Sequence, residues 1–454
     1  MSLALILEQP EAPRLVTKLP GPRAASIVAR DHAVLSPSYT RDYPFVIDHG
    51  IGVVVDDPDG NRFLDLNAGI AVCSTGHRHP LVVEAIRGQI DRFLHMSGTD
   101  FYYEEQIAVG ERLAAVAPMA GPCRVVFGNS GAEATEAAFK LARHHTGRPH
   151  VIAFYGAFHG RTLGALSLTA SKAVQRRGFL PLVPEVTHVQ YPFCYRCDRR
   201  DQVPAGADCC GRSLGELEEV LLRRMVSPTE VAAIFVEAVQ GEGGYVVPPP
   251  SFLRGLRRVC DEHGILLVCD EVQSGMGRTG KMFAVEHSGV EPDIVAVAKG
   301  VASGLPLGAV VARAELMHWE RGAHASTFGG NPVSCAAALA TLDLLEGGLV
   351  AHAAEMGGHL RLRLMEVMAR QSAIGDVRGL GLMTAVDLVT SRETRQPDPT
   401  LRDAVLEQAF QRGVLLLGCG ESAIRFSPPL VISRAQIDTA MEIFDAAVSA
   451  AVGR

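Results

Sequence analysis

Short, continuous runs of hydrophobic residues recur along the middle of the chain, and stretches with helical spacing separate them. Runs of this length without polar interruption are typical of strands that are buried on both faces of a sheet. Strands that alternate with helices predict an α/β fold, in which helices cover both faces of a mostly parallel sheet. The runs interpreted as strands cover residues 124–127, 150–154, 231–236, 265–270, 294–298 and 308–312.

The two ends of the chain have a different pattern. Near the start, two strand-like segments flank the turn sequence Asp57-Pro58-Asp59-Gly60-Asn61, which predicts a β-hairpin. Near the end, helical patterns predominate and only short strand-like runs interrupt them, which predicts a smaller α+β domain. The predicted organisation is an N-terminal arm and hairpin over residues 1–75, a large α/β domain over 76–335 and a small α+β domain over 336–454.

An acidic residue and a lysine end two of the predicted strands. Asp270 closes one hydrophobic run, and Lys299 directly follows another. Ligands bind beyond the carboxyl ends of parallel strands, so we expect both side chains at one site. Together they suit pyridoxal phosphate, whose aldehyde forms a Schiff base with a lysine and whose ring nitrogen needs an acidic partner. Taken alone, the pair would favour a sheet-end carboxylate and a solvated lysine.

A turn that opens a helix is a candidate anion site. The sequence Gly128-Asn129-Ser130-Gly131-Ala132 follows a predicted strand and precedes a helix, with Ser130 placed to cap it. The free N–H groups and positive dipole end of a helix attract anions, so a cofactor phosphate could bind there. An ordinary capped turn without a ligand has the same sequence pattern.

Aromatic and charged residues at other strand ends extend the candidate site. Phe158 can stack on a flat ring, and Arg161 can form a two-bond fork with a carboxylate. Glu237 ends a further strand and suits pairing with an arginine better than action as a base. Arg425 lies between hydrophobic neighbours, where an arginine usually needs an anionic partner. The structural alternatives are a packed phenylalanine, surface arginines and a helix-capping or solvent-facing acid.

Composition excludes some classes of partner. Hydrophobic residues make up 47% of the chain and charged residues 20%, which is ordinary for a globular protein. The net charge of −7 argues against nucleic acid or an anionic membrane as the main partner. The first residues lack a basic leader and meet Glu8 too soon for a secretory signal, so we expect a cytoplasmic protein.

Four of the ten cysteines are clustered in one segment. Cys194 and Cys197 form a C-x-x-C pair, and Cys209 and Cys210 follow within a stretch that resembles a surface loop. This spacing permits a zinc site, a disulfide or free thiols, although adjacent cysteines are awkward ligands for one tetrahedral metal.

Several ordered motifs, taken together, resemble the class-III (ω-amino-acid) aminotransferases of the fold-type-I pyridoxal-phosphate superfamily. The resemblance extends over nearly the whole chain, and the motifs are specific in combination. They are Asn129-Ser130-Gly131-Ala132-Glu133-Ala134, Phe158-His159-Gly160-Arg161-Thr162, Gln240-Gly241-Glu242-Gly243, Asp270-Glu271-Val272-Gln273, Ala298-Lys299-Gly300 and Thr327-Phe328-Gly329-Gly330-Asn331-Pro332.

The resemblance implies a role for each motif residue at the cofactor. Lys299 would carry the Schiff base, Asp270 would bind the ring nitrogen, and Gln273 would bind the phenolic oxygen. Phe158 and Val272 would sandwich the ring. A contact from the other subunit implies an obligate homodimer with its sites at the interface. The other cofactor-binding residues implied are Ser130, Gly131 and Ala132 at the phosphate, His159, Glu237, and Thr327 from that second subunit.

The resemblance also implies roles at the substrate. Arg161 would bind a distal carboxylate, and Arg425 the α-carboxylate of glutamate or 2-oxoglutarate. Glu237 would hide the charge of Arg425 while an ω-amine is bound and then swing away, so that one site serves two differently charged substrates. Ile70 would line the substrate side, where an isoleucine resembles 4-aminobutyrate-type members more than ornithine-type ones.

Two functional hypotheses follow from the resemblance. The first is an aminotransferase that moves the amino group of an ω-amino acid, such as 4-aminobutyrate or ornithine, to 2-oxoglutarate in ping-pong order. The alternative is a pyridoxal-phosphate-dependent amino-acid racemase of the same family. A racemase needs a second acid–base group besides Lys299, and the sequence does not identify one.

Overall fold

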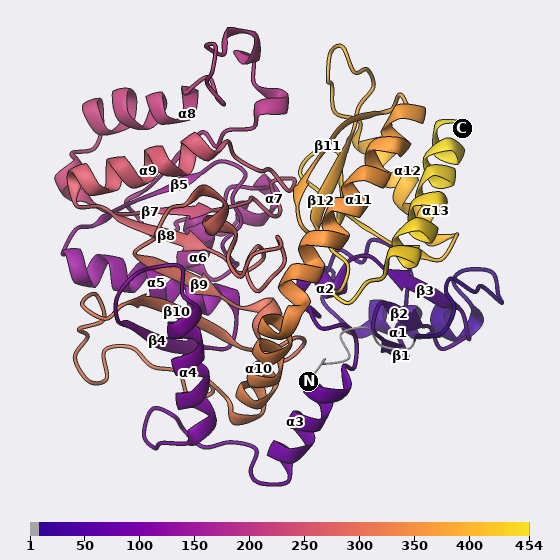
Figure 1. Cartoon of the computed structure of the whole chain (residues 1–454), viewed down its shortest axis with the longest axis horizontal. Coiled ribbons are helices and arrows are strands. Elements are labelled where there is room, and N and C mark those ends of the chain that lie inside the picture. Colours follow the sequence, from indigo (N-terminus) through magenta and orange to yellow (C-terminus); the bar gives the residue numbers. More distant parts are fainter. Residues whose placement is uncertain (1–8, 454) are drawn as a thin grey trace.

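A computed structural model describes residues 9–453 of the chain. Residues 1–8, on which the expectation of a cytoplasmic protein partly depends, lie outside the described residues, and the cellular location stays a prediction. Two lobes lie side by side in Figure 1, with the middle of the sequence in one lobe and both ends of the sequence in the other.

The larger lobe is built on a seven-stranded sheet with the order β4-β10-β9-β8-β7-β5-β6. The pairs from β9 through β8, β7 and β5 to β6 are parallel, whereas β10 runs antiparallel to both β4 and β9. The strands are β4 (Cys123–Gly128), β5 (His150–Phe154), β6 (Val186–Val189), β7 (Val231–Glu237), β8 (Leu266–Asp270), β9 (Ile294–Val297) and β10 (Gly308–Arg313).

Both faces of this sheet are buried, as continuous hydrophobic runs require. In β5, Ile152 and Phe154 belong to one core cluster and Val151 and Ala153 to another, because alternate side chains of a strand point to opposite faces. The helices of this lobe are α3 (Pro80–Ile90), α4 (Glu104–Val116), α5 (Gly131–Thr146), α6 (Leu163–Leu168), α7 (Ala173–Arg176), α8 (Arg212–Gly215) and α9 (Pro250–His263).

The smaller lobe combines both ends of the chain in two four-stranded sheets. The hairpin predicted around Asp57–Asn61 is present, and its second strand pairs in parallel with a strand from the end of the chain. One sheet contains β1 (His49–Ile51), β2 (Val54–Asp56), β3 (Arg62–Asp65) and β13 (Val414–Leu415), and the other contains β11 (Ile374–Leu380), β12 (Met383–Leu388), β15 (Ala423–Phe426) and β14 (Leu417–Cys419). The helices are α1 (Pro22–Val34), α2 (Ala68–Ala71), α11 (Val350–Arg370), α12 (Pro399–Phe410) and α13 (Arg434–Val452).

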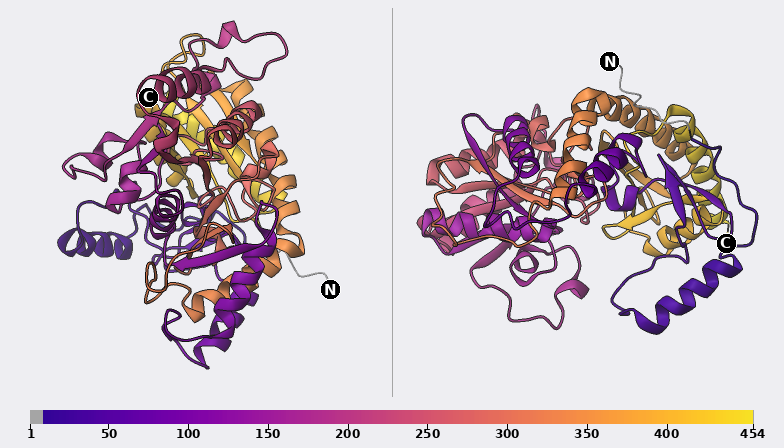
Figure 2. Two further views of the ribbon diagram at one scale, coloured as in Figure 1. Left: turned by 90° about the vertical axis from the view of Figure 1, so that its left-hand side faces the viewer. Right: turned by 90° about the horizontal axis from the view of Figure 1, so that it is seen from below.

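A long helical stretch connects the two lobes. It runs from Pro332 to Arg370 through α10 (Pro332–Leu344), a π-helical turn and α11. By length and composition alone it could cross a membrane, but 56% of its most hydrophobic window is buried in the protein, as in the core helix of a soluble protein. In the views of Figure 2, α1 lies at the margin of the small lobe, far from the seven-stranded sheet.

The predicted fold class is confirmed: a mostly parallel sheet lies between helices, and a smaller α+β part accompanies it. The seven strands of the large sheet all fall inside the predicted range 76–335. The boundaries at residues 75 and 335 stay predictions.

Candidate active site

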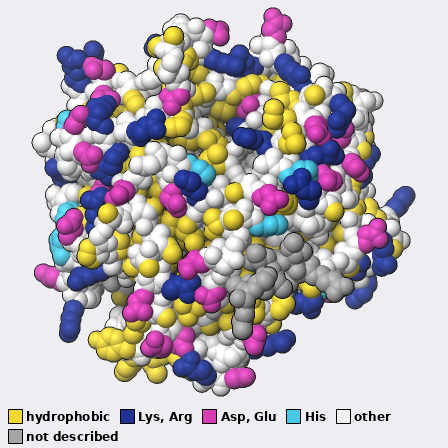
Figure 3. Space-filling view, in the orientation of Figure 1, with side chains coloured by type: hydrophobic (Ala, Val, Ile, Leu, Met, Phe, Trp, Pro, Cys, Tyr) yellow, Lys and Arg dark blue, Asp and Glu magenta, His cyan; other side chains and the backbone are white. Residues whose placement is uncertain are grey.

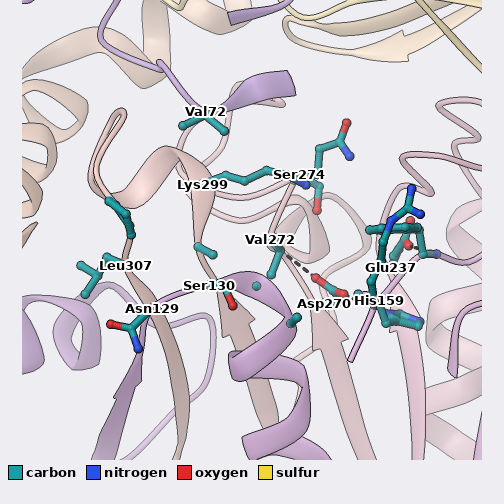
Figure 4. A pocket seen from close by; sticks show the side chains of 18 of the residues that line it. Val72, Asn129, Ser130, His159, Glu237, Asp270, Val272, Ser274, Lys299 and Leu307 are labelled. Carbon is teal, nitrogen blue, oxygen red and sulfur yellow. Dashed lines mark hydrogen bonds and ion pairs between the residues drawn. The ribbon is translucent and has the colours of Figure 1, made fainter. Parts of the chain in front are cut away.

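A pocket opens at the carboxyl ends of the central parallel strands. Glu237 and Asp270 are register partners at the ends of β7 and β8, and Lys299 lies two residues beyond β9. The pocket has a volume of about 480 Å³. Figure 4 shows the Lys299 side chain extending across the pocket above Val272. The predicted convergence of the acid and the lysine is therefore what the structure shows.

Asp270 is held in place by two donors. One carboxylate oxygen accepts the backbone N–H of Val272 at 2.9 Å, and the other lies 2.7 Å from Nδ1 of His159. Burial lowers the pKa of His159, but the hydrogen bond and charge of Asp270 outweigh it and raise that pKa above its ordinary value. His159 would therefore act on the cofactor through Asp270, which is a more specific arrangement than the motif alone implied.

The amine of Lys299 is tuned toward its neutral form. Burial in the pocket lowers its pKa, although the carboxylates of Asp270, Glu242 and Glu237 oppose this effect. The neutral amine is the form that attacks a carbonyl. Its backbone has a φ of 46°, a left-handed conformation that costs roughly 1–2 kcal/mol for a residue with a side chain.

The start of α5 (Gly131–Thr146) lines the pocket and is a candidate anion site. Ser130 caps α5 by accepting the N–H of Glu133 at 3.2 Å, and the first N–H groups of the helix, from Gly131 and Ala132, have no partner within it. A β-carbon at position 131 would lie 2.6 Å from Cγ1 of Val272, so only glycine lets the helix start approach this wall of the pocket.

The walls of the pocket suit a flat ring. Phe158 and Val272 both line it. Gln273 also lines it, and its side-chain oxygen accepts the hydroxyl of Tyr245 at 2.9 Å. Pyridoxal phosphate requires an amine, a carboxylate, flat walls and an anion site. The described residues supply all four and so fit this cofactor. When bound, it supplies an electron sink for the carbon next to the substrate nitrogen.

The predicted pairing of Glu237 with Arg425 is wrong. Glu237 is buried and accepts the backbone N–H groups of Phe158 at 2.8 Å and Gly241 at 2.6 Å. Burial raises the pKa of Glu237 to about 7, the charge of His159 lowers it, and that of Asp270 raises it. Its carboxylate is committed to holding the backbone around the pocket.

The carboxylate that pairs with Arg425 belongs to Glu242. Its Oε1 lies 2.5 Å from Nη1 of Arg425, and Arg425 is only 5% exposed. Burial raises the pKa of Glu242, but the charge and hydrogen bond of Arg425 outweigh this and lower it below the ordinary value. Both residues act electrostatically on Lys299, which places this ion pair beside the pocket.

Of three further predicted site residues, one lines the pocket and two do not. Arg161 lines the pocket, with its guanidinium carbon 5.8 Å from the centre of the Phe158 ring. Ile70 is 38% exposed and is not among the residues that line the pocket of the described chain. Thr327 is exposed and also outside this pocket, so its proposed contact with a second subunit stays a prediction.

Some pocket residues were not predicted from the sequence. Val72, Asn129 and Leu307 line the pocket. Asn129 donates to Glu133 at 2.8 Å and to Ser326 at 3.1 Å, and so joins the helix start to the loop before α10. The neighbouring motif at Gly128–Ala132 was the available signal for Asn129. No comparable signal identified Leu307, which precedes an otherwise ordinary strand.

The four clustered cysteines lie away from this pocket. The structure contains them as free thiols, and among residues 9–453 there is no group of three or more histidine, cysteine or acidic side chains arranged to hold a metal ion. The proposed zinc site therefore has no support in the geometry of the described residues.

This fold, with a lysine and an acid at the ends of its parallel strands, defines a fold-type-I pyridoxal-phosphate enzyme. The family model for aminotransferase class-III matches residues 36–448, and the chain belongs to this family of pyridoxal-phosphate-dependent transaminases.

Relatives within the family differ in reaction. The chain is 41% identical to a 4-aminobutyrate aminotransferase of Mycobacterium tuberculosis, over 95% of this chain and 96% of the relative. It is 40% identical to an alanine/serine racemase of Pyrococcus horikoshii, over 98% of this chain and 94% of the relative. Its structure superimposes on a PLP-bound amine transaminase from an uncultivated Pseudomonas species with a TM-score of 0.84 and 33% identity, covering 92% of this chain and 98% of that one.

His159 offers a test of the hydrogen bond to Asp270. In the His159→Leu variant, Asp270 loses one of its two donors, so we expect kcat to fall by roughly 10- to 100-fold. The pH at which the visible absorbance of the bound cofactor changes should shift as well, which a merely structural role would not cause. His159→Gln retains an N–H donor, so it should recover part of kcat and part of the normal pH dependence of the absorbance. Equal defects in the two variants would contradict the assigned role.

Proposed function

We propose that this enzyme transfers the amino group of an ω-amino acid of the 4-aminobutyrate type to 2-oxoglutarate. The observation that carries the proposal is the Glu242–Arg425 ion pair beside the pocket. A donor whose reacting amine is at the ω-position brings no carboxylate to this end of the site, and Glu242 then neutralises Arg425. Glutamate and 2-oxoglutarate bring an α-carboxylate, which can replace Glu242 at the guanidinium.

The energetics of the pair explain why it suits two substrates. A buried arginine without an anion costs several kcal/mol, so Arg425 needs a carboxylate in both half-reactions. Glu242 supplies it in one half-reaction and the substrate supplies it in the other. Arg161 lines the pocket, and its guanidinium would bind the carboxylate at the far end of either substrate.

The alternative is an amino-acid racemase, which the 40% identity to the Pyrococcus horikoshii enzyme favours. The reaction of the holoenzyme with an amino acid alone, without an oxo acid, distinguishes an aminotransferase from a racemase. The holoenzyme is mixed with 4-aminobutyrate, and separately with L-alanine, while absorbance and optical purity are followed. Conversion of the cofactor to its amine form by 4-aminobutyrate is expected. Loss of optical purity of alanine without such conversion by either amino acid would overturn the proposal.

We infer that a second copy of the chain completes the assembly. Exposed hydrophobic side chains gather on the connection between α3 and α4, at the lower margin of Figure 3, and Tyr102 there is 94% exposed. Phe328, beside Thr327, is 60% exposed. Patches of this kind mark protein interfaces. Sedimentation of the holoenzyme as a dimer is expected, and a monomer at micromolar concentration would contradict the inference.

Glu242 can be tested apart from the cofactor chemistry. In Glu242→Gln, Arg425 keeps its charge but loses its ionic partner, so kcat/KM for 4-aminobutyrate should fall by roughly 10- to 100-fold. The glutamate half-reaction should be retained within about threefold, because its own carboxylate binds Arg425. Single-turnover absorbance changes measure each half-reaction.

The matched control is Glu219→Gln, which breaks the exposed ion pair between Glu219 and Arg223 on the surface. It should leave both half-reactions unchanged. Equal losses of the two half-reactions in Glu242→Gln would remove the argument for the ion pair as a selector between substrates.

A further inference from the structure

Two thiols of the cysteine cluster lie close together, and their pKa values are shifted in opposite directions. Sγ of Cys197 lies 3.3 Å from Sγ of Cys210, and all four thiols are half-buried. Burial raises the pKa of Cys194 to about 12 and also raises that of Cys197. Burial acts in the same direction on Cys210, but the N–H of Arg212 and the neighbouring thiols outweigh it and lower its pKa. Cys210 is therefore the thiol of the pair that ionises first.

The cluster is accessible to small molecules. A hollow of about 1060 Å³ opens beside it, and all four cysteines line this hollow. Charged side chains of both signs also line it: Arg196, Arg200 and Arg212, and Asp198, Asp208 and Asp376. The hollow is large enough to admit a disulfide of low molecular weight to the thiols.

The segment that carries Cys197 joins the two lobes of the protein. Arg196 binds the carboxylate of Asp387 in β12 at 2.8 Å, and Arg395 of the small lobe donates to the carbonyl of Tyr195 at 2.9 Å. The prediction of a surface loop at these residues is therefore incomplete, because part of the segment packs between the lobes.

A second contact leads toward the active site. The guanidinium of Arg378 lies 4.7 Å from the centre of the Phe193 ring. The same guanidinium donates to the carbonyl of Gly244 at 2.6 Å, two residues beyond Glu242. The position of the cysteine segment is thus linked by direct contacts to the loop that holds Glu242 beside Arg425.

We propose that Cys197 and Cys210 are a redox-active dithiol that a low-molecular-weight disulfide converts into an intramolecular disulfide. Cys210 loses its proton to solvent, and its thiolate attacks one sulfur of the small disulfide and expels one thiolate, which takes up a proton from solvent. The sulfur of Cys197 then attacks Cys210, expels the second thiolate and passes it the proton. Two protein thiols are oxidised to one disulfide, and the small disulfide is reduced to two thiols.

The disulfide would close the loop between residues 197 and 210. A cross-link of this kind restricts the unfolded chain and stabilises the native one. It would hold the Phe193–Arg196 segment against the small lobe, where Arg196 and Tyr195 already bind. The oxidised holoenzyme should unfold at a temperature roughly 2–5 °C higher than the reduced one.

The test uses reduced holoenzyme incubated with glutathione disulfide in the absence of oxygen. Free thiols are then alkylated, and the protein is weighed intact and mapped by peptide mass. We expect a loss of two alkylation sites and a peptide pair that joins Cys197 to Cys210. The Cys197→Ser and Cys210→Ser variants should not form this disulfide, and the rise in unfolding temperature should be absent from both. Cys123→Ser, at a half-buried cysteine elsewhere in the chain, should behave like the unchanged protein.

Four results would overturn the inference. These are an unchanged thiol count, persistent glutathione adducts without a cross-link, a cross-link that excludes either cysteine, and about one zinc ion per chain that is lost in Cys210→Ser. A cross-link that leaves the unfolding temperature unchanged would overturn its stabilising role.

Discussion

The Lys299→Ala variant is expected to lose turnover by roughly 10⁴-fold or more in both half-reactions. Lys299 is an amine that lines the pocket, and burial lowers its pKa, which favours the nucleophilic neutral form. Without it, the cofactor loses its covalent link, and the substrate carbon loses the amine placed to move its proton. Steady-state rates and the visible absorbance of the holoenzyme measure the two losses separately.

Lys281→Ala is the matched control. Lys281 donates to the carbonyl of Glu286 at 3.1 Å, outside the pocket, and its replacement should leave both rate and absorbance intact. Activity of Lys299→Ala above about 1% of the unchanged enzyme would contradict the assignment. Folding of the variant is checked by its unfolding temperature, which should not fall, because the change removes a buried amine.

The second large effect is expected for Asp270→Asn, with a fall in kcat of roughly 10²- to 10⁴-fold. The carboxylate of Asp270 favours a positively charged neighbour, whereas an amide of the same shape does not. The change also removes the anionic partner of His159, so the pKa of His159 should fall from its raised value. The pH dependence of the cofactor absorbance reports this change independently of rate.

Asp261→Asn serves as the control for Asp270→Asn. Asp261 is exposed and pairs with Arg257 on α9, which keeps Asp293 as a second partner, so the change should alter kcat by less than about twofold. An Asp270→Asn variant that binds the cofactor and turns over at more than about 10% of the normal rate would contradict the role of the carboxylate.

The large sheet was predictable because its strands bury both faces. The runs at 150–154 and 294–298 contain no polar residue after the first position, and the structure has strands there within one residue. β6 and β11 were not predicted. β6 is an edge strand with the polar pair Thr187-His188, and β11 has glycine and charged residues at half-buried positions, so neither has a continuous hydrophobic pattern.

The site was predictable where a strand end fixes the side chain. Asp270 and Lys299 follow buried runs, and the parallel arrangement of β8 and β9 brings them together. The partner of Arg425 was not predictable in this way. Glu237 and Glu242 lie five positions apart, and the choice depends on the loop Gly241–Gly244, whose backbone N–H at Gly241 binds Glu237 and leaves Glu242 to face Arg425.

Borohydride reduction of the holoenzyme, followed by proteolysis and peptide mass mapping, tests the central assignment most directly. Reduction makes the carbon–nitrogen link between cofactor and lysine permanent. One modified peptide is expected, carrying the cofactor on Lys299. An adduct on another lysine, or the absence of any adduct from enzyme that is saturated with cofactor, would contradict this assignment.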